Sequence, residues 1–280
     1  MSLDELLEAQ EAFQQIGIDA VMYFDADKIT AGIEPARAYS AYLVSREVKF
    51  LVFLGKTDGM FTCIITLFNN SPTFVNNQQG AWKVTDTRLH EMLVTVFRDS
   101  WLTQKKENFL INDQPELDIQ VPVITARRSE LYPIDLKIDN LAILKSEDPA
   151  IQAEMETMLN SVYPYPGKYK FVDVIPENEK DLKRQGVQYL MHYVNCRGKT
   201  AKDLLGYDVT RGESAYGSVT FPNGVPQVKT IPVENTVFKF YIKHIESGNT
   251  FLGTKWDADE SRIQAMKNYI MAFKSEMKLN

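Results

Sequence analysis

Residues 61–96 read FTCIITLFNNSPTFVNNQQGAWKVTDTRLHEMLVTV, and residues 238–270 read FKFYIKHIESGNTFLGTKWDADESRIQAMKNYI. Each segment begins with β-branched and aromatic residues, continues through a loop to a tryptophan, and ends in apolar residues spaced three and four apart. The segments align with a single deletion in the second loop. Because alternation predicts a strand and a 3.6-residue period predicts a helix, we predict that the chain carries one strand–loop–helix design twice.

The residues before each segment extend this repeat. Val48–Leu54 is an apolar run of strand length, and Asp58-Gly59 is typical of a tight hairpin turn. Val187–Val194 holds the matching position in the second half. We therefore predict an α+β fold with two tandem copies of a β-α-β-β-α unit. Its sheets are expected to be mainly antiparallel, with helices packed on one face and a long extended segment joining the copies.

The predicted domain boundaries follow the repeat. Residues 1–112 form the first unit, 113–165 an extended connector with a helix, and 166–280 the second unit with an insertion at 195–232. Before its helix, the connector contains three prolines and shows no helical period, and proline confines strands to sheet edges. Leu141-Ala142-Ile143 is accordingly expected to be an edge strand or extended chain.

Composition narrows the class of protein. The 280 residues carry a net charge of −6, which disfavours nucleic-acid binding, and no apolar run is long enough to span a bilayer. Two cysteines are too few for a disulfide framework. The polar, acidic N-terminus is unlike a signal peptide. A cytoplasmic location is the default expectation, and export with a removed leader is left open.

The repeat gives each candidate catalytic or metal-binding residue a counterpart in the other half. His192 corresponds to Phe53 and His244 to Leu67, and Cys63 falls on the apolar face of its strand. These pairings predict two core histidines and a buried thiol. In the predicted register the two histidines would lie about 16 Å apart at about 3.3 Å per residue, too far to share an ion. We expect no metal site, no catalytic residue and no cofactor.

Two of the three tryptophans precede matching helices. Trp82 and Trp256 are expected to pack each helix start against its sheet, with stacking on a ligand as the alternative. Asp257-Ala258-Asp259 follows Trp256, and carboxylates in this spacing occur in cation-binding loops. Asp259 aligns with Thr85, however, and both suit a helix N-cap. Capping is the favoured interpretation.

One basic segment is a candidate anion site. Gly198-Lys199-Thr200 follows a predicted strand and begins a predicted helix, but it lacks the earlier glycine of a phosphate-binding P-loop. Arg197, Lys199 and Thr200, with the N–H groups of the helix start, are predicted to bind an anion. The alternative is a solvated basic loop.

A second surface is predicted from residue type alone. Arg127, Arg128 and Tyr132 lie in the connector, and arginine and tyrosine are enriched in protein interfaces. They are candidate partner contacts, with a solvated loop as the alternative.

Without a visible nucleophile, base and oxyanion donor, the function expected is a non-enzymatic binding or structural and assembly protein. It would contact a protein partner or itself, for example through a hairpin strand at a sheet edge. The alternative is a protein or enzyme that binds a small anionic ligand near the insertion, with Asp203 as a possible base.

Overall fold

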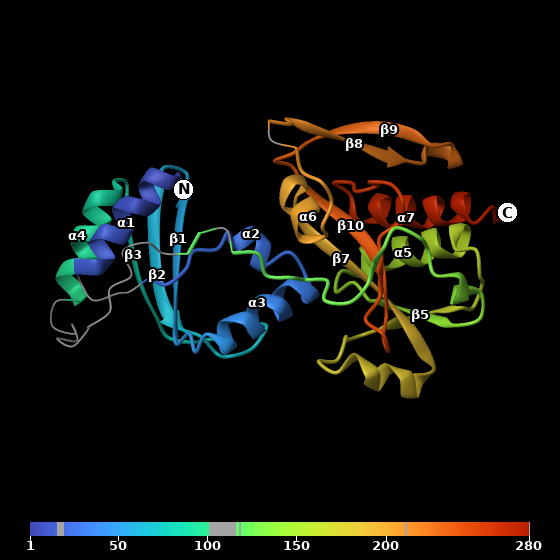
Figure 1. Ribbon diagram of the computed structural model, residues 1–280, viewed down its shortest axis with the longest axis horizontal. Helices are drawn as coiled ribbons and strands as arrows, with labels where there is room; N and C mark the ends of the chain where they lie inside the picture. The colour runs from blue at the N-terminus through green and yellow to red at the C-terminus, as the bar shows by residue number, and fades with distance from the viewer. Residues whose placement is uncertain (16–19, 101–115, 118, 211, 280) are drawn as a thin grey trace. The chain divides into compact units, whose positions relative to one another are not determined.

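The computed structural model describes residues 1–15, 20–100, 116–117, 119–210 and 212–279. These residues form two compact units (Figure 1). Unit 1 consists of Met1–Asp25 and Ala36–Val121, and unit 2 consists of Ala26–Pro35 and Pro122–Asn280. The predicted boundaries remain predictions, but in this division the part of the connector after residue 121 belongs to unit 2.

Unit 1 is a three-stranded antiparallel sheet covered by two helices. Its elements are α1 (Leu3–Gln15), most of α3 (Ile33–Ser45), β1 (Phe50–Thr57), β2 (Met60–Leu67), β3 (Ala81–Asp86) and α4 (Leu89–Ser100). The strand order is β1-β2-β3. Apolar residues of β2 and of the helices α1 and α4 form the core, and Cys63 lies in it with no exposed surface.

The predicted hairpin is confirmed. Asp58 and Gly59 have φ of 50° and 78°, the left-handed conformation that a tight hairpin turn requires. The residues around Trp82 differ from the expectation, since Trp82 and Thr85 lie inside β3 and pair with β2. The Asp86 carboxylate accepts a hydrogen bond from Arg88 N just before α4, so the predicted Thr85 cap is wrong.

Unit 2 is built around a six-stranded sheet. Its elements are α2 (Ala26–Ile29), β4 (Arg128–Ser129), η1 (Ile134–Lys137), β5 (Asn140–Leu144), α5 (Pro149–Val162), β6 (Tyr169–Val172), η2 (Glu179–Gln185), β7 (Val187–Arg197), α6 (Gly198–Leu204), β8 (Ala215–Thr220), η3 (Pro222–Gly224), β9 (Gln227–Pro232), β10 (Thr236–His244), β11 (Thr250–Phe251) and α7 (Arg262–Glu276).

The sheet of unit 2 is mixed. The strand order is β4-β11-β10-β7-β5-β6, and β8 and β9 form a separate antiparallel ribbon. β10 is antiparallel to β7 and β11, but β5 is parallel to both β6 and β7. The expectation of a mainly antiparallel sheet is therefore wrong for unit 2. β5 is also an interior strand, because its apolar Leu141, Ala142 and Ile143 are buried between two neighbours.

Both faces of this sheet are covered. On one face, α5 and α7 pack over Tyr189, Met191, Phe240 and Ile242 (Figure 1). On the other face, a second apolar cluster joins the sheet to Leu182 of η2 and to the start of α3. The prediction of helices on one face is therefore wrong for unit 2. Alternate residues of β7 and β10 point to the two faces because side chains alternate along a strand.

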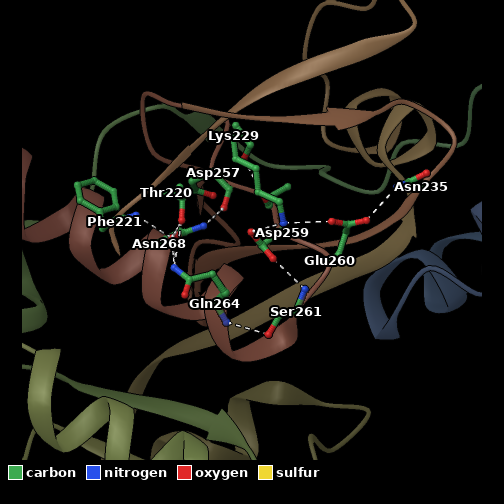
Figure 2. A network of polar contacts seen from close by, with 12 residues as sticks. Thr220, Phe221, Lys229, Asn235, Asp257, Asp259, Glu260, Ser261, Gln264 and Asn268 are labelled. Carbon is green, nitrogen blue, oxygen red and sulfur yellow. Dashed lines mark hydrogen bonds and ion pairs between the residues drawn. The ribbon is translucent and has the colours of Figure 1, made fainter. Parts of the chain in front are cut away.

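A polar network ties the β8–β9 ribbon to α7. Figure 2 shows Asn268, which is completely buried, between Thr220 and the segment before the helix. Its side-chain oxygen accepts from Phe221 N and Thr220 Oγ1, and its amide donates to the Asp257 carbonyl at 3.2 Å. Ser261 caps α7 by accepting from Gln264 N. Asp259 accepts from Ser261 N instead, so the predicted Asp259 cap is displaced by two residues.

Each half contains three neighbouring strands before a helix, β1-β2-β3 before α4 and β7-β10-β11 before α7, although α6, β8, η3 and β9 lie between β7 and β10 in the chain. Their tryptophans have different surroundings. Trp82 pairs with Ile65 inside a sheet, whereas Trp256 lies outside any strand, edge-on to Tyr207 and Tyr216. The tandem duplication remains a prediction, and the α+β class is what the helices and mixed sheets support.

Candidate metal centre

Four ionisable side chains meet on the face of the sheet opposite α7. His192 comes from the middle of β7, Lys243 from β10, Glu179 from the first position of η2, and Glu34 from the first turn of α3. Glu34, Glu179 and His192 each offer a ligand atom within 4.8 Å of the other two. We call these three residues and Lys243 the carboxylate–histidine cluster.

Glu34 reaches the cluster because its segment lies directly on β7. Ala31 O accepts a hydrogen bond from Asn195 N, and Gly32 lies against the Tyr193 carbonyl. A Cβ at Gly32 would be 2.6 Å from that oxygen, and the φ of Gly32 is +150°. Glycine is required here because no other residue allows the backbones to approach so closely.

The cluster is strongly buried. The exposed fractions of the side chains are 3% for His192, 8% for Glu179, 11% for Glu34 and 20% for Lys243. The Lys243 ammonium is 2.5 Å from Glu34 Oε2 and 2.9 Å from Glu179 Oε2. Lys243 therefore holds one oxygen of each carboxylate and fixes the orientation of both groups.

The His192 Nε2 atom points at Glu179 but makes no hydrogen bond among the described residues. It lies 3.4 Å from Glu179 Oε1, which is longer than an ordinary hydrogen bond of about 2.7–3.2 Å. Two ligands about 2.0–2.1 Å from a tetrahedral Zn²⁺ are roughly 3.4 Å apart. The spacing of these two atoms therefore suits an edge of a metal coordination shell better than a direct contact.

The charges of the cluster determine the ionisation of Glu179. Burial alone would raise the pKa of Glu179, but His192 and Lys243 outweigh burial and lower this pKa to about 2. Burial likewise disfavours the ammonium of Lys243, yet Glu34 and Glu179 raise the pKa of Lys243 above its ordinary value. Both groups are charged at neutral pH, and Glu179 is available as an anionic ligand.

A small cavity adjoins the cluster. It has a volume of about 10 Å³ and is lined by His192 and the apolar residues Ile33, Leu144, Ile175, Met191 and Tyr193. That space is enough for about one water molecule. Three protein ligands with a water in the fourth position are typical of open zinc sites. Of the cluster, only His192 lines this cavity, so the cavity offers room for a water molecule beside the imidazole.

Of the predicted anion-binding side chains, that of Arg197 already has protein partners. The Arg197 guanidinium contacts Asp27 at 2.9 Å and Glu234 at 3.3 Å, and Lys28 pairs with Asp203. The N–H groups of Gly198 and Lys199 donate to backbone carbonyls of Asn235 and Val233. Lys199 is exposed and Thr200 is buried. Anion binding remains a prediction, and the helix start offers it fewer donors than expected.

The predicted partner-contact residues lie in different environments. Arg127 is exposed. Arg128 donates to the Leu205 carbonyl and lies over the ring of Tyr207. Tyr132 is only 4% exposed and packs against α7, so it is a core residue of unit 2. A partner contact remains a prediction here, with Arg127 as the exposed member of the group.

Sequence reasoning weighed the histidines and the carboxylates of Asp257-Ala258-Asp259 as metal ligands, but it did not consider Glu34 or Glu179. His192 and His244 do not share a site, because His244 lies opposite Tyr189 and bonds Ser247. A weak signal was present, since an acidic residue in the first turn of each helix was visible. The sequence did not show which strand those helix starts would contact.

No family model, curated protein or solved structure matches this chain. Among the described residues, no helix combines the length and apolarity needed to cross a lipid bilayer.

Proposed function

We propose that the chain is a non-enzymatic binding protein and that unit 2 binds one divalent transition-metal ion, with Zn²⁺ as the best-suited candidate. Glu34, Glu179 and His192 would be the ligands. The observation that supports this most strongly is the buried Nε2 of His192, which lies 3.4 Å from Glu179 Oε1 and has no hydrogen bond among the described residues. Imidazole and carboxylate groups are ordinary zinc ligands.

Lys243 would act as an outer partner of the ligands. Residues that hold a ligating carboxylate commonly tune the metal site. The positive charge of Lys243 also repels an incoming cation, so the proposal implies moderate affinity. Lys243 has another role without metal, because its charge offsets two neighbouring carboxylates.

Zinc titration by calorimetry, backed by elemental analysis after dialysis, tests the proposal. The wild-type chain is expected to bind one Zn²⁺, and His192→Gln or Glu179→Gln to weaken binding at least tenfold. Lys243→Met should tighten binding about tenfold, because it removes the repelling charge and leaves the two carboxylates to be neutralised by the ion; tenfold corresponds to about 1.4 kcal/mol.

The matched control is His244→Gln, the same substitution at the other histidine of unit 2, which should bind Zn²⁺ like the wild type. Circular dichroism of each variant checks that it is folded. A wild-type chain that takes up no zinc, or equal affinity in the His192 and His244 variants, would contradict the proposal.

Assembly through a sheet edge is a second candidate function. Among the described residues, β1 pairs only with β2, so its other edge has no strand beside it. Phe50 and Phe53 on this strand are 59% and 41% exposed, and its first six residues carry no charge or proline. Natural edge strands usually carry a charged residue or a proline, which prevents them from pairing with another chain. This favours pairing of β1 with β1 of a second copy.

Sedimentation velocity at increasing concentration tests this assembly. The wild-type chain is expected to form dimers, and Phe53→Lys to weaken dimerisation at least tenfold by placing a charge beside the edge. Val228→Lys, on an exposed position of β9 in unit 2, is the matched control and should still dimerise. A wild-type chain that stays monomeric at all concentrations would refute the pairing.

A further inference from the structure

Unit 2 contains a second ionic pair, which is completely enclosed. Lys239 of β10 and Asp257, which precedes α7, have no exposed side-chain surface, and Lys239 Nζ lies 2.7 Å from Asp257 Oδ1. Lysine and aspartate are almost never fully buried in proteins unless they are paired. The pair does not belong to the carboxylate–histidine cluster, whose four residues it does not share.

The lysine is firmly positioned. Its ammonium also donates to the Leu252 carbonyl at 2.8 Å and lies 5.0 Å from the centre of the Tyr269 ring. Tyr269 is fixed in turn, because its hydroxyl donates to the Phe251 carbonyl. Asp257 is anchored through its backbone carbonyl, which accepts from Asn268 (Figure 2). The amine and the carboxyl are therefore held together by rigid neighbours.

The polar groups around the pair are incompletely satisfied. Asp257 Oδ2 and the hydroxyls of Tyr132 and Tyr207 are buried and make no hydrogen bond among the described residues. Burial raises the pKa of both tyrosines, and the charge of Asp257 raises it further. A buried ion pair is stabilising only when its remaining polar atoms are satisfied. The ionic form of this pair therefore lacks some of the hydrogen bonds that would offset the desolvation cost of the two charges.

We propose that Lys239 and Asp257 condense to form an intramolecular amide bond between Nζ and Cγ. A nitrogen 2.7 Å from one carboxyl oxygen lies roughly 3–4 Å from the carboxyl carbon, close to the separation from which reacting atoms of an oriented pair combine. Enclosure removes the water that stabilises the separate ions and that would hydrolyse the product. The amide carries no charge, so condensation relieves the desolvation cost of both ions.

The reaction balances without any further reagent. A proton passes from the Lys239 ammonium to the Asp257 carboxylate, which gives a neutral amine and a carboxylic acid. The amine nitrogen attacks Cγ, the C–N bond forms, and one Cγ–O bond breaks. The released water takes its oxygen from Asp257 and its two hydrogens from the original ammonium. Burial raises the pKa of Asp257 to about 6, which assists this transfer. The charge of Asp257 outweighs burial at Lys239 and raises the pKa of the ammonium, which opposes the transfer, so the neutral pair is the less populated and reactive form.

The hydroxyls of Tyr132 and Tyr207 make no hydrogen bond to Asp257 Oδ2, so the proposed condensation uses the two reacting groups alone. The product would tie β10 covalently to the segment before α7.

Intact-mass spectrometry of the denatured, purified full chain tests the proposal directly. The expected mass is lower than that of the linear sequence by one water molecule. Trypsin should then yield a branched peptide that joins residues 230–243, uncleaved after Lys239, to residues 256–262. A wild-type chain with the full mass of its sequence would overturn the proposal without the need for any variant.

Two controls identify the source of a water loss. Asp58-Gly59 can lose water by forming a succinimide, which mild base reverses, whereas the amide persists in base. Localisation of the loss to Asp58 would therefore overturn the proposal. Lys239→Arg should restore the full mass, because its guanidinium is not nucleophilic. The matched Lys229→Arg, at the lysine paired with Asp259, should still lose water.

Discussion

Chains with Lys239→Met alone are expected to unfold about 3–4 kcal/mol more easily at pH 7 than chains with both Lys239→Met and Asp257→Asn. The single variant leaves a carboxyl group in a site with no exposed surface. Since the ordinary pKa of aspartate is about 3.9, keeping this group neutral at pH 7 costs up to about 4 kcal/mol. Asparagine has nearly the same size and never carries that charge. Neither variant can form the amide, so the difference reports the charge alone.

The sign of the pH dependence provides an internal check. The folded pKa of Asp257 is raised, so the folded state binds a proton more readily than the unfolded state. The penalty of the single variant is therefore present at neutral pH. It should shrink by about 1.4 kcal/mol for each unit that the pH falls below 7, until the unfolded carboxyl also protonates.

Urea denaturation at pH 5, 6 and 7 measures the difference. Trp256 lies in unit 2, so its fluorescence follows this unit once Trp82 and Trp101 are replaced by phenylalanine. Equal stability of the single and double variants at pH 7, or a gap that does not change with pH, would show that Asp257 is solvated in a way the structure does not indicate.

Acidification is expected to weaken unit 2 through Glu179. The folded pKa of Glu179 is about 2, below its ordinary value of 4.5, so the ionised form stabilises the fold. This contribution is complete above pH 4.5 and is lost as the pH falls towards 2. The shift corresponds to about 3 kcal/mol, as an upper value, because Glu179 shares its charge interactions with His192 and Lys243.

Comparison of Glu179→Gln with the wild type isolates this contribution. The variant should be less stable at pH 6, and the two stability curves should converge as the pH falls from 4.5 to 2. Glu246→Gln is the matched control, since Glu246 pairs with Lys180 and Lys183 on the surface and should have little effect. Curves that stay parallel for Glu179→Gln down to pH 2 would contradict the cause assigned to its pKa.

Local features of the fold were predictable because their cause lies within a few residues. Asp58-Gly59 determines a tight turn through its backbone preferences, and the alternation at the start of β2 indicates the burial of Phe61 and Cys63. At the end of β2 the alternation is wrong, because Leu67 is exposed and Thr66 is buried. The same holds for α7, whose apolar period is clear. His192 was predicted to be a core residue from its alignment with Phe53, and it is 3% exposed.

Errors arose where distant strands compete for the same partner. Leu141–Ile143 looked like an edge or connector, yet the run pairs with β6 and β7 on its two sides. Trp82 appeared to precede a helix but lies in a strand. A short apolar run has the same pattern at the edge and in the interior, so periodicity alone cannot assign its neighbours.

By itself, the sequence determined the α+β class, the first hairpin, the amphipathic helices and the burial of Cys63. These follow from side-chain period and turn chemistry, which act over a few residues. Only the tertiary structure decided that Glu34 and Glu179 approach His192, and that Lys239 and Asp257 share one enclosed site. These contacts depend on which faces of the helices and strands pack together. The packing free energy is a sum over the whole unit, so no single segment of the sequence determines it.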